Sequence, residues 1–126
     1  MMSKKILAID YGTVRVGLAV SYGTLAEPLQ VIANNEKIFE NLGKIIEGER
    51  VEEIVVGVSE NEMAQQTLDF VEKLKQLISL PIHTSDETLS SFEVEQKLKV
   101  LKKSKRDGEI DHYAATIILQ NYLDSL

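Results

Sequence analysis

The stretch that decides the fold is Lys4-Lys-Ile-Leu-Ala-Ile-Asp-Tyr-Gly-Thr-Val-Arg-Val-Gly-Leu-Ala-Val20. Its two β-prone halves, residues 4–9 and 15–20, are separated by a short segment that contains Gly12. Glycine between two such runs predicts an antiparallel hairpin. The first half is followed at once by Asp10, so we expect a carboxylate at the end of the first strand.

The apolar pattern downstream predicts alternating strands and helices. Residues 29–33, after Pro28, predict a third short strand, and residues 54–58 are apolar without alternation, as in a strand covered on both faces at the sheet centre. We also expect a helix that is capped by Asn34 or Asn35 and ends near Gly48, and a second helix from Asn61 to Ser79. A strand from Pro81 to Thr84 should follow, and then a helix with a capping box at Ser90 and Glu93. After a break at Asp107-Gly108, a last helix is expected to begin near Asp111. This order predicts an α/β fold with parallel pairing after the hairpin.

Length and composition set the broad class of protein. The chain has 126 residues, of which 44% are hydrophobic and 27% charged, so we expect one globular domain spanning residues 1–126. It contains no cysteine, which excludes a disulfide framework and a thiolate zinc site. The N-terminal run is too short for a signal peptide, and no stretch approaches the ~20 apolar residues of a membrane span. We therefore expect a cytoplasmic protein without a membrane partner.

The charge is unevenly distributed along the chain. The formal net charge is −6, which argues against a protein that coats nucleic acid, yet no acid lies between Gln96 and Arg106. The basic residues there are Lys97, Lys99, Lys102, Lys103, Lys105 and Arg106. Lys99, Lys102, Lys103 and Arg106 share helical spacing and could contact nucleic-acid phosphates together, although such a run is also typical of a solvated helix face.

Acidic residues follow the expected strands or open the last helix: Asp10, the pair Asp86/Glu87, and Asp111. Ligands of open α/β sheets bind at the carboxyl ends of the strands, where a cluster of carboxylates needs a cation to offset its repulsion. Carboxylates without cysteine or paired histidine suit Mg²⁺ or Mn²⁺, and two such ions about 3.5 to 4 Å apart can hydrolyse a phosphodiester.

Each of these acids also has a purely structural interpretation. Asp10 could form a turn, Asp86 could be a loop residue, Glu87 a solvated charge, and Asp111 a helix N-cap. His83 and His112 lack metal-ligand spacing and receive no role.

Four segments carry a family resemblance: Asp10-Tyr-Gly-Thr-Val-Arg15-Val-Gly17-Leu-Ala19, Val55-Val56-Gly57, Asp86-Glu87-Thr88-Leu89-Ser90-Ser91, and Asp111-His-Tyr-Ala114-Ala115 with Ile118-Leu119-Gln120-Asn-Tyr122-Leu123. In this order, over nearly the whole chain, they resemble the YqgF/RuvX family. The first and last segments are specific in combination, whereas each middle segment is weak.

The resemblance implies a ribonuclease-H-like fold: a mixed five-stranded sheet, with three antiparallel strands and then two parallel, flanked by helices. The family is described both as Holliday junction resolvases and as nucleases that mature the 5′ end of the small-subunit ribosomal RNA precursor. By this resemblance Asp10, Asp86/Glu87 and Asp111 ligate metal, Glu87 being preferred within the pair, and Arg15 supports the site or faces phosphate. The implied catalytic residues are Asp10, Glu87 and Asp111.

Two departures from the family pattern bear on activity. The family usually has Asp-Glu-Arg followed by Leu-Thr-Thr, whereas this chain has Thr88 and then Ser90-Ser91, and the usual Gly-Leu-Pro is Gly57-Val58-Ser59. The acids are kept, but an arginine that could bind phosphate in bidentate fashion is missing. Substrate affinity or rate is expected to be lower, unless the basic residues compensate.

Four interpretations of the function stay open at the level of sequence. The chain could cut precursor rRNA, acting as a monomer, or four-way DNA, which calls for a homodimer that cuts two strands symmetrically. It could also be a catalytically silent nucleic-acid-binding module. Finally, Asp10-Tyr-Gly-Thr resembles the first phosphate loop of actin-like ATPases, but those enzymes need two such domains.

Overall fold

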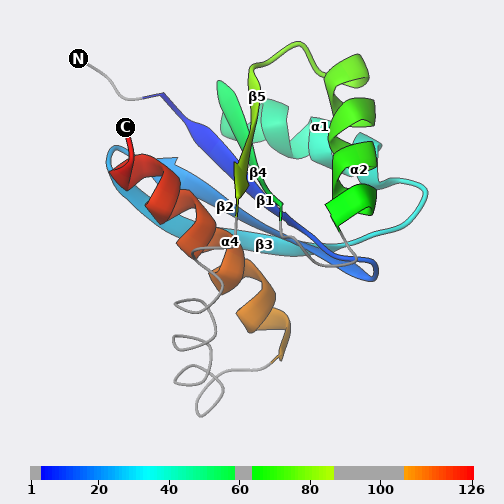
Figure 1. Ribbon diagram of the computed structural model, residues 1–126, viewed down its shortest axis with the longest axis horizontal. Helices are drawn as coiled ribbons and strands as arrows, with labels where there is room; N and C mark the ends of the chain where they lie inside the picture. The colour runs from blue at the N-terminus through cyan, green and yellow to red at the C-terminus, as the bar shows by residue number, and fades with distance from the viewer. Residues whose placement is uncertain (1–3, 59–63, 87–106) are drawn as a thin grey trace.

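The computed structural model describes residues 4–58, 64–86 and 107–126, with side chains for all of these except residues 86 and 107–113. Its elements, in chain order, are β1 (Ile6–Tyr11), β2 (Arg15–Tyr22), β3 (Leu25–Ala33), α1 (Ile38–Glu49), β4 (Glu53–Val58), α2 (Ala64–Leu77), β5 (Ile82–Asp86) and α4 (Asp107–Asp124). They form a five-stranded sheet in the order β3-β2-β1-β4-β5 (Figure 1). β1, β2 and β3 pair antiparallel, and β4 and β5 extend the sheet parallel to β1. This confirms the expected mixed sheet.

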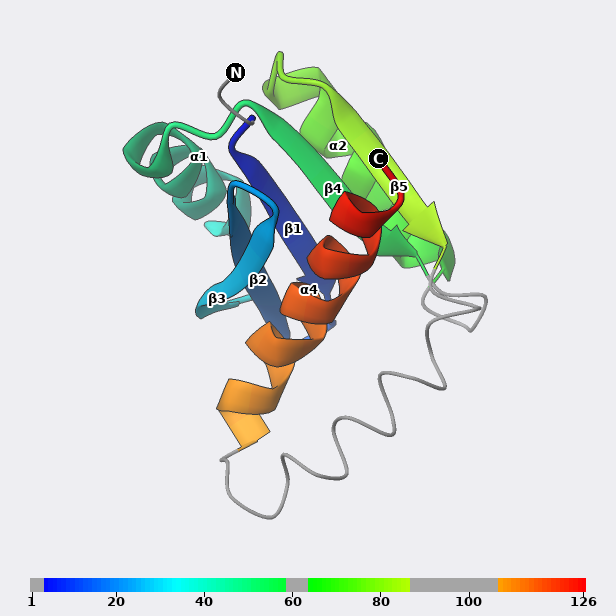
Figure 2. The ribbon, with the colours of Figure 1, turned by 90° about the vertical axis from the view of Figure 1, so that its left-hand side faces the viewer.

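The sheet separates two layers of helices (Figure 2). On one face, α1 and α2 cover a large apolar cluster that includes Leu7, Ile9, Leu18 and Val56. On the other face, α4 covers a smaller cluster whose members are Ile6, Ala8, Ala19, Val55, Ala115 and Leu119. Alternate residues of β1 thus enter different clusters, as the two-residue period of a strand requires.

The central strand is β1, not the run at residues 54–58 that the sequence placed there. An apolar run without alternation shows only that both faces of a strand are covered. That condition holds for β4, which lies between β1 and β5 and whose Ile54, Val55 and Val56 are fully buried.

β3 is longer than expected, since it begins at Leu25 rather than after Pro28. Proline lacks an N–H donor and is tolerated in a strand mainly at a sheet edge or a bulge. β3 is an edge strand, and Pro28 pairs with Ala19 where the register shifts between Leu18 and Ala19. Both conditions are therefore met.

Two helix boundaries also differ from the expectation. α4 begins at Asp107, so Asp107-Gly108 opens the helix instead of breaking it, and Asp111 lies in its second turn rather than at its N-cap. The N-cap of α1 is Lys37, which makes no side-chain cap; the Asn35 side chain instead accepts a hydrogen bond from the Lys37 amide at 2.9 Å. The helix predicted from Ser90 and Glu93 lies outside the described residues.

Candidate functional site

Asp10 lies near the carboxyl end of the central strand on the face covered by α4. Ile6 and Ala8 belong to the cluster under α4, and the strand period places Asp10 on the same side. Its neighbour Tyr11 packs on the opposite side, with its ring centroid 4.6 Å from that of Phe70. Asp10 is half-buried, so the residue is partly accessible to solvent.

Glycines flank Asp10 on both neighbouring strands. Gly17 of β2 pairs directly with Asp10, and Gly57 of β4 comes one residue after Val56, the partner of Ile9. On β5, the outermost strand next to β4, Ser85 pairs with Gly57. Neither adjacent position carries a side chain, and both glycines are buried. We call the carboxyl ends of β1, β4 and β5 the Asp10 edge.

In the turn between β1 and β2, the backbone of Arg15 lies close to Gly12. A Cβ atom at this position would lie 2.5 Å from the Arg15 carbonyl oxygen, so only glycine fits without displacing the backbone. Asn34, after the end of β3, donates a hydrogen bond from Nδ2 to the Gly12 carbonyl at 2.7 Å and from its amide to the Val14 carbonyl at 2.9 Å. Asn34, considered in the sequence only as a helix cap, therefore stabilises the turn that follows Asp10.

Arg15 opens β2 on the same side of the sheet as Asp10. Arg15, Gly17 and Ala19 alternate with core residues of the other face, and Ala19 lies beneath α4. Gly17 pairs with Asp10, so Arg15, two residues before Gly17, is the diagonal neighbour of Asp10 across the two strands. Diagonal neighbours of this kind are about 7–8 Å apart. Arg15 is exposed and begins β2 beside the Asp10 edge, and its supporting or phosphate-facing role stays a prediction.

The other predicted ligands are placed only in part. Asp86 is the last residue of β5 and pairs with Val58, and Asp111 lies in α4, but their side chains are outside the described set. Glu87, Lys99, Lys102, Lys103 and Arg106 are outside the described residues altogether. Among the residues that are described, no three His, Asp or Glu side chains gather as a metal site. The full ligand set stays a prediction.

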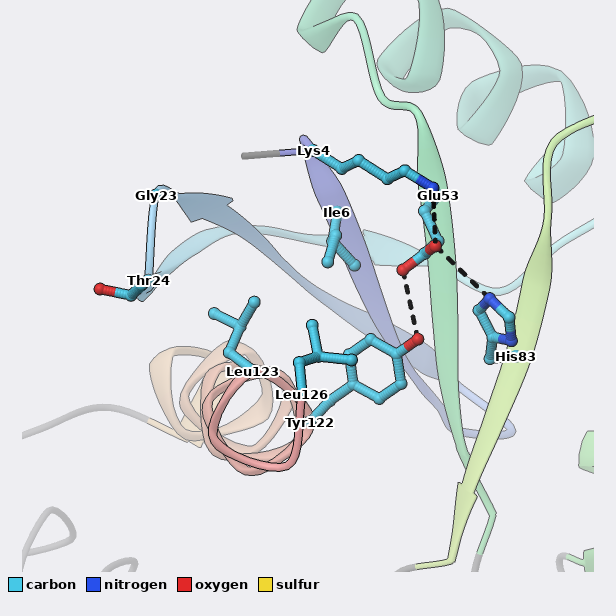
Figure 3. A pocket seen from close by; sticks show the side chains of 9 residues that line it. All are labelled: Lys4, Ile6, Gly23, Thr24, Glu53, His83, Tyr122, Leu123 and Leu126. Carbon is cyan, nitrogen blue, oxygen red and sulfur yellow. Dashed lines mark hydrogen bonds and ion pairs between the residues drawn. The ribbon is translucent and has the colours of Figure 1, made fainter. Parts of the chain in front are cut away.

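A second polar cluster lies at the opposite edge of the sheet, where β1 and β4 begin. The side chain of Glu53 is 11% exposed, and its Oε1 lies 3.8 Å from Lys4 Nζ and 3.5 Å from His83 Nε2. Tyr122 of α4 donates a hydrogen bond to Glu53 Oε2 at 3.2 Å. Figure 3 shows these side chains around a pocket of about 590 Å³.

Glu53 has a structural role that the sequence did not predict. Burial, the negative charge of Glu53 and the hydrogen bond to it raise the pKa of Tyr122 above its usual 10.0. The rings of His83 and Tyr122 also stack at 5.9 Å. Glu53 and Tyr122 are 69 positions apart, so no local sequence pattern links them.

Comparison with known proteins identifies the family of this chain. Residues 4–125 match the family model described as RuvX, Holliday junction resolvase. The chain belongs to the RuvX family. It is 39% identical to a relative from Sulfurihydrogenibium sp., over 97% of this chain and 91% of the relative, and 37% identical to one from Thermoanaerobacter pseudethanolicus, over 96% of each. Both relatives are named as candidate pre-16S rRNA nucleases.

Solved structures show the same fold. RuvC of T. thermophilus, in complex with a Holliday junction substrate, aligns with a TM-score of 0.64 at 15% identity, over 98% of this RuvX chain and 96% of that one. The resolvase of Fowlpox virus, solved with Holliday junction DNA, aligns with a TM-score of 0.55 at 11% identity, over 96% and 97% of the two chains. The fold is therefore ribonuclease-H-like, as the resemblance implied.

Membership of this family makes the chain a nuclease, that is, a hydrolase that cleaves nucleic acid. Nucleases with this fold generally use a divalent metal, and the carboxylate of the half-buried Asp10 at the end of β1 is chemically suited to be an oxygen ligand for such an ion. No helix in the described part of the chain is long and apolar enough to cross a membrane.

Proposed function

We propose that this RuvX protein is a Mg²⁺- or Mn²⁺-dependent nuclease whose metal ligands are Asp10, Asp111 and the pair Asp86/Glu87. The observation that carries the proposal is the position of Asp10: half-buried at the carboxyl end of the central strand, with Gly17 and Gly57 on either side. Because glycine has no side chain, neither neighbouring position blocks the Asp10 carboxylate from binding a cation. When bound, the metal supplies an activated water and stabilises the leaving oxygen.

The course of α4 supports the assignment of Asp111. α4 runs so that its first turns lie toward the Asp10 edge and its last turns toward the opposite edge (Figures 1 and 2). Ala115 and Leu119 pack against the sheet, and position 111 lies one turn before Ala115 on the same helical stripe. A carboxylate at this position is suited to complete a site with Asp10.

The strand period favours Glu87 over Asp86. His83 and Ser85 pair with Val55 and Gly57, which lie on the α4 face of β4 together with Glu53. Continuing the two-residue period from Ser85 predicts Glu87, rather than Asp86, as the acid on the side of Asp10. We accordingly propose Asp10, Glu87 and Asp111 as the catalytic carboxylates.

Arg15 is proposed to bind a substrate phosphate beside the metal ligands. Its place on the same face as Asp10, two residues before Gly17, supports this role, and its guanidinium can offer two donors to one phosphate. The basic residues Lys99, Lys102, Lys103 and Arg106 are proposed to extend the contact along the nucleic-acid backbone. They would offset the loss of the arginine that the family usually has at position 88.

The proposed substrate is the 5′ region of the small-subunit rRNA precursor, in the cytoplasm, with the chain acting as one domain over residues 1–126. The relatives named for this activity support it, because they match at 36–39% identity over nearly the whole chain. The second candidate is a four-way DNA junction, which is favoured by the family description and by the fold shared with junction-bound resolvases.

The experiment that separates these substrates is a cleavage assay with purified protein on precursor rRNA and on four-way DNA junctions, in Mg²⁺ or Mn²⁺. Oligomeric state is measured on the same sample, since a junction resolvase must cut two strands symmetrically and is expected to dimerise. Cleavage of the RNA by a monomer is the expected result. Paired incisions in the junction by a dimer, with intact RNA, would favour the second candidate, and binding without cleavage of either would indicate a silent module.

A further inference from the structure

Small side chains make up half of the buried apolar cluster between α4 and the sheet. Three of the six residues in its apolar cluster, Ala8, Ala19 and Ala115, are alanines. Helices settle into position when large side chains of one element fill grooves of the other, and alanines supply neither ridges nor deep grooves. The alanines therefore restrain the tilt and position of the helix less than larger side chains at the same places would.

Gln120 provides directional contacts that this packing lacks. Its Nε2 donates to the Thr24 carbonyl at 3.0 Å, and its Oε1 accepts from the Ala26 amide at 3.0 Å. One side chain thus bonds both a donor and an acceptor of the turn and strand that follow β2. Because Thr24 and Ala26 are backbone partners 96 and 94 positions away, these bonds tie the end of α4 to a distant, fixed part of the sheet.

The opposite flank of α4 is held by Tyr122. Its hydroxyl bonds Glu53 at the start of β4, whereas Gln120 reaches Thr24 and Ala26 on the other side of the helix. In Figure 3 Tyr122 points from α4 toward Glu53, and Thr24 lies on the far side of the helix. Two directional anchors on opposite flanks fix the rotation of α4 about its axis as well as its tilt.

We propose that Gln120 is a positioning residue for the metal site: by fixing α4 on the sheet, it sets the distance between Asp111 and Asp10. The inference rests on the proposed function, since it assumes that Asp111 is a ligand. Gln120 lies nine residues after Asp111, or about 14 Å along the helix, so a small change of tilt at the Gln120 end displaces position 111. Metal affinity is sensitive to such displacement.

The test measures Mn²⁺ binding to the full-length protein by electron paramagnetic resonance, for the wild type, Gln120→Met and Gln65→Met. Methionine keeps the length of glutamine but neither donates nor accepts as an amide does. Gln65 of α2 is the matched control because it bonds Asp69 at i+4, as Gln120 bonds Asp124, but makes no contact with the β2–β3 turn. The expected result is about three- to tenfold weaker Mn²⁺ binding for Gln120→Met alone.

Urea unfolding on the same samples separates positioning from stability. A residue that only stabilises the fold lowers the unfolding midpoint but leaves the Mn²⁺ dissociation constant of the folded protein unchanged, and that outcome would overturn the inference. If Gln120→Met does not fold, the comparison uses Gln120→Glu in place of Gln120→Met. Glutamate keeps the acceptor for the Ala26 amide but loses the donor to the Thr24 carbonyl. Asp10→Asn is measured alongside: if it leaves Mn²⁺ binding intact, the proposed metal site itself is refuted, whatever Gln120 does.

Discussion

Gly12→Ala is the substitution whose consequence follows most directly from the geometry. Gly12 sits in the turn between β1 and β2, and an added Cβ would lie 2.5 Å from the Arg15 carbonyl oxygen, whereas real Cβ atoms stay beyond 3.0 Å. The atom in the way is backbone, so no side chain can rotate aside. The hairpin must open by about half an ångström to accept the methyl group.

The cost can be worked out from what that opening disturbs. Forcing extra atoms into a closely packed place costs about 1–3 kcal/mol. Opening also strains the two hydrogen bonds that Asn34 makes to Gly12 and Val14, each contributing about 1 kcal/mol. We expect the free energy of unfolding to fall by about 2–3 kcal/mol and Tm to fall by roughly 8–12 °C for a chain of this size.

The assay is urea unfolding followed by circular dichroism, with Gly43→Ala and Gly48→Ala as controls. Both control glycines lie in α1, where a Cβ would meet nothing within 4 Å, so alanine should raise stability by roughly 0.5–1 kcal/mol. The opposite signs distinguish crowding from a general effect of alanine. A Gly12→Ala protein within about 0.5 kcal/mol of the wild type would refute the crowding argument.

Two further predictions concern the helix ends. Arg50, after α1, has left-handed backbone angles (φ 57°, ψ 45°), so Arg50→Gly should raise the free energy of unfolding by about 0.5–1 kcal/mol in urea, and a loss would contradict this. The raised pKa of Tyr122 means that the folded state holds its proton more tightly than the unfolded state, so its contribution to stability is complete below pH 10 and is lost as the pH rises further. Wild type should therefore lose stability more steeply above pH 10 than Tyr122→Phe, and parallel curves for the two proteins would disprove the link.

Sequence reasoning worked best where one local pattern determines the structure. The apolar run before Asp10 and the run at residues 54–58 were correctly predicted as strands, because each is buried on both faces by nearby elements. Sequence reasoning was less accurate where the place of a strand within the sheet decides its length. Pro28 was taken as a strand boundary, but at a sheet edge the missing N–H costs little, and the strand begins three residues earlier, at Leu25.

The candidate site shows the same contrast between residues of one local motif and residues that come together only in the fold. Asp10, Gly12 and Gly17 form one local motif, so the place of Asp10 at a strand end could be predicted from the sequence. The Glu53, His83 and Tyr122 cluster could not, since it joins residues from β4, β5 and α4 through side-chain contacts that leave no periodic signal. The same holds for Asn34, whose bond to the Gly12 carbonyl depends on how β3 pairs with β2.

The central claim, that Asp10 holds the catalytic metal, is tested most directly by comparing Mg²⁺- and Mn²⁺-dependent cleavage by the wild type, Asp10→Asn and Asp69→Asn. Asparagine is close to isosteric with aspartate, so the fold should survive, and Asp69 is an exposed carboxylate of α2 on the other face of the sheet. We predict that Asp10→Asn abolishes cleavage while Asp69→Asn cleaves like the wild type. An unchanged rate in folded Asp10→Asn would contradict the metal site.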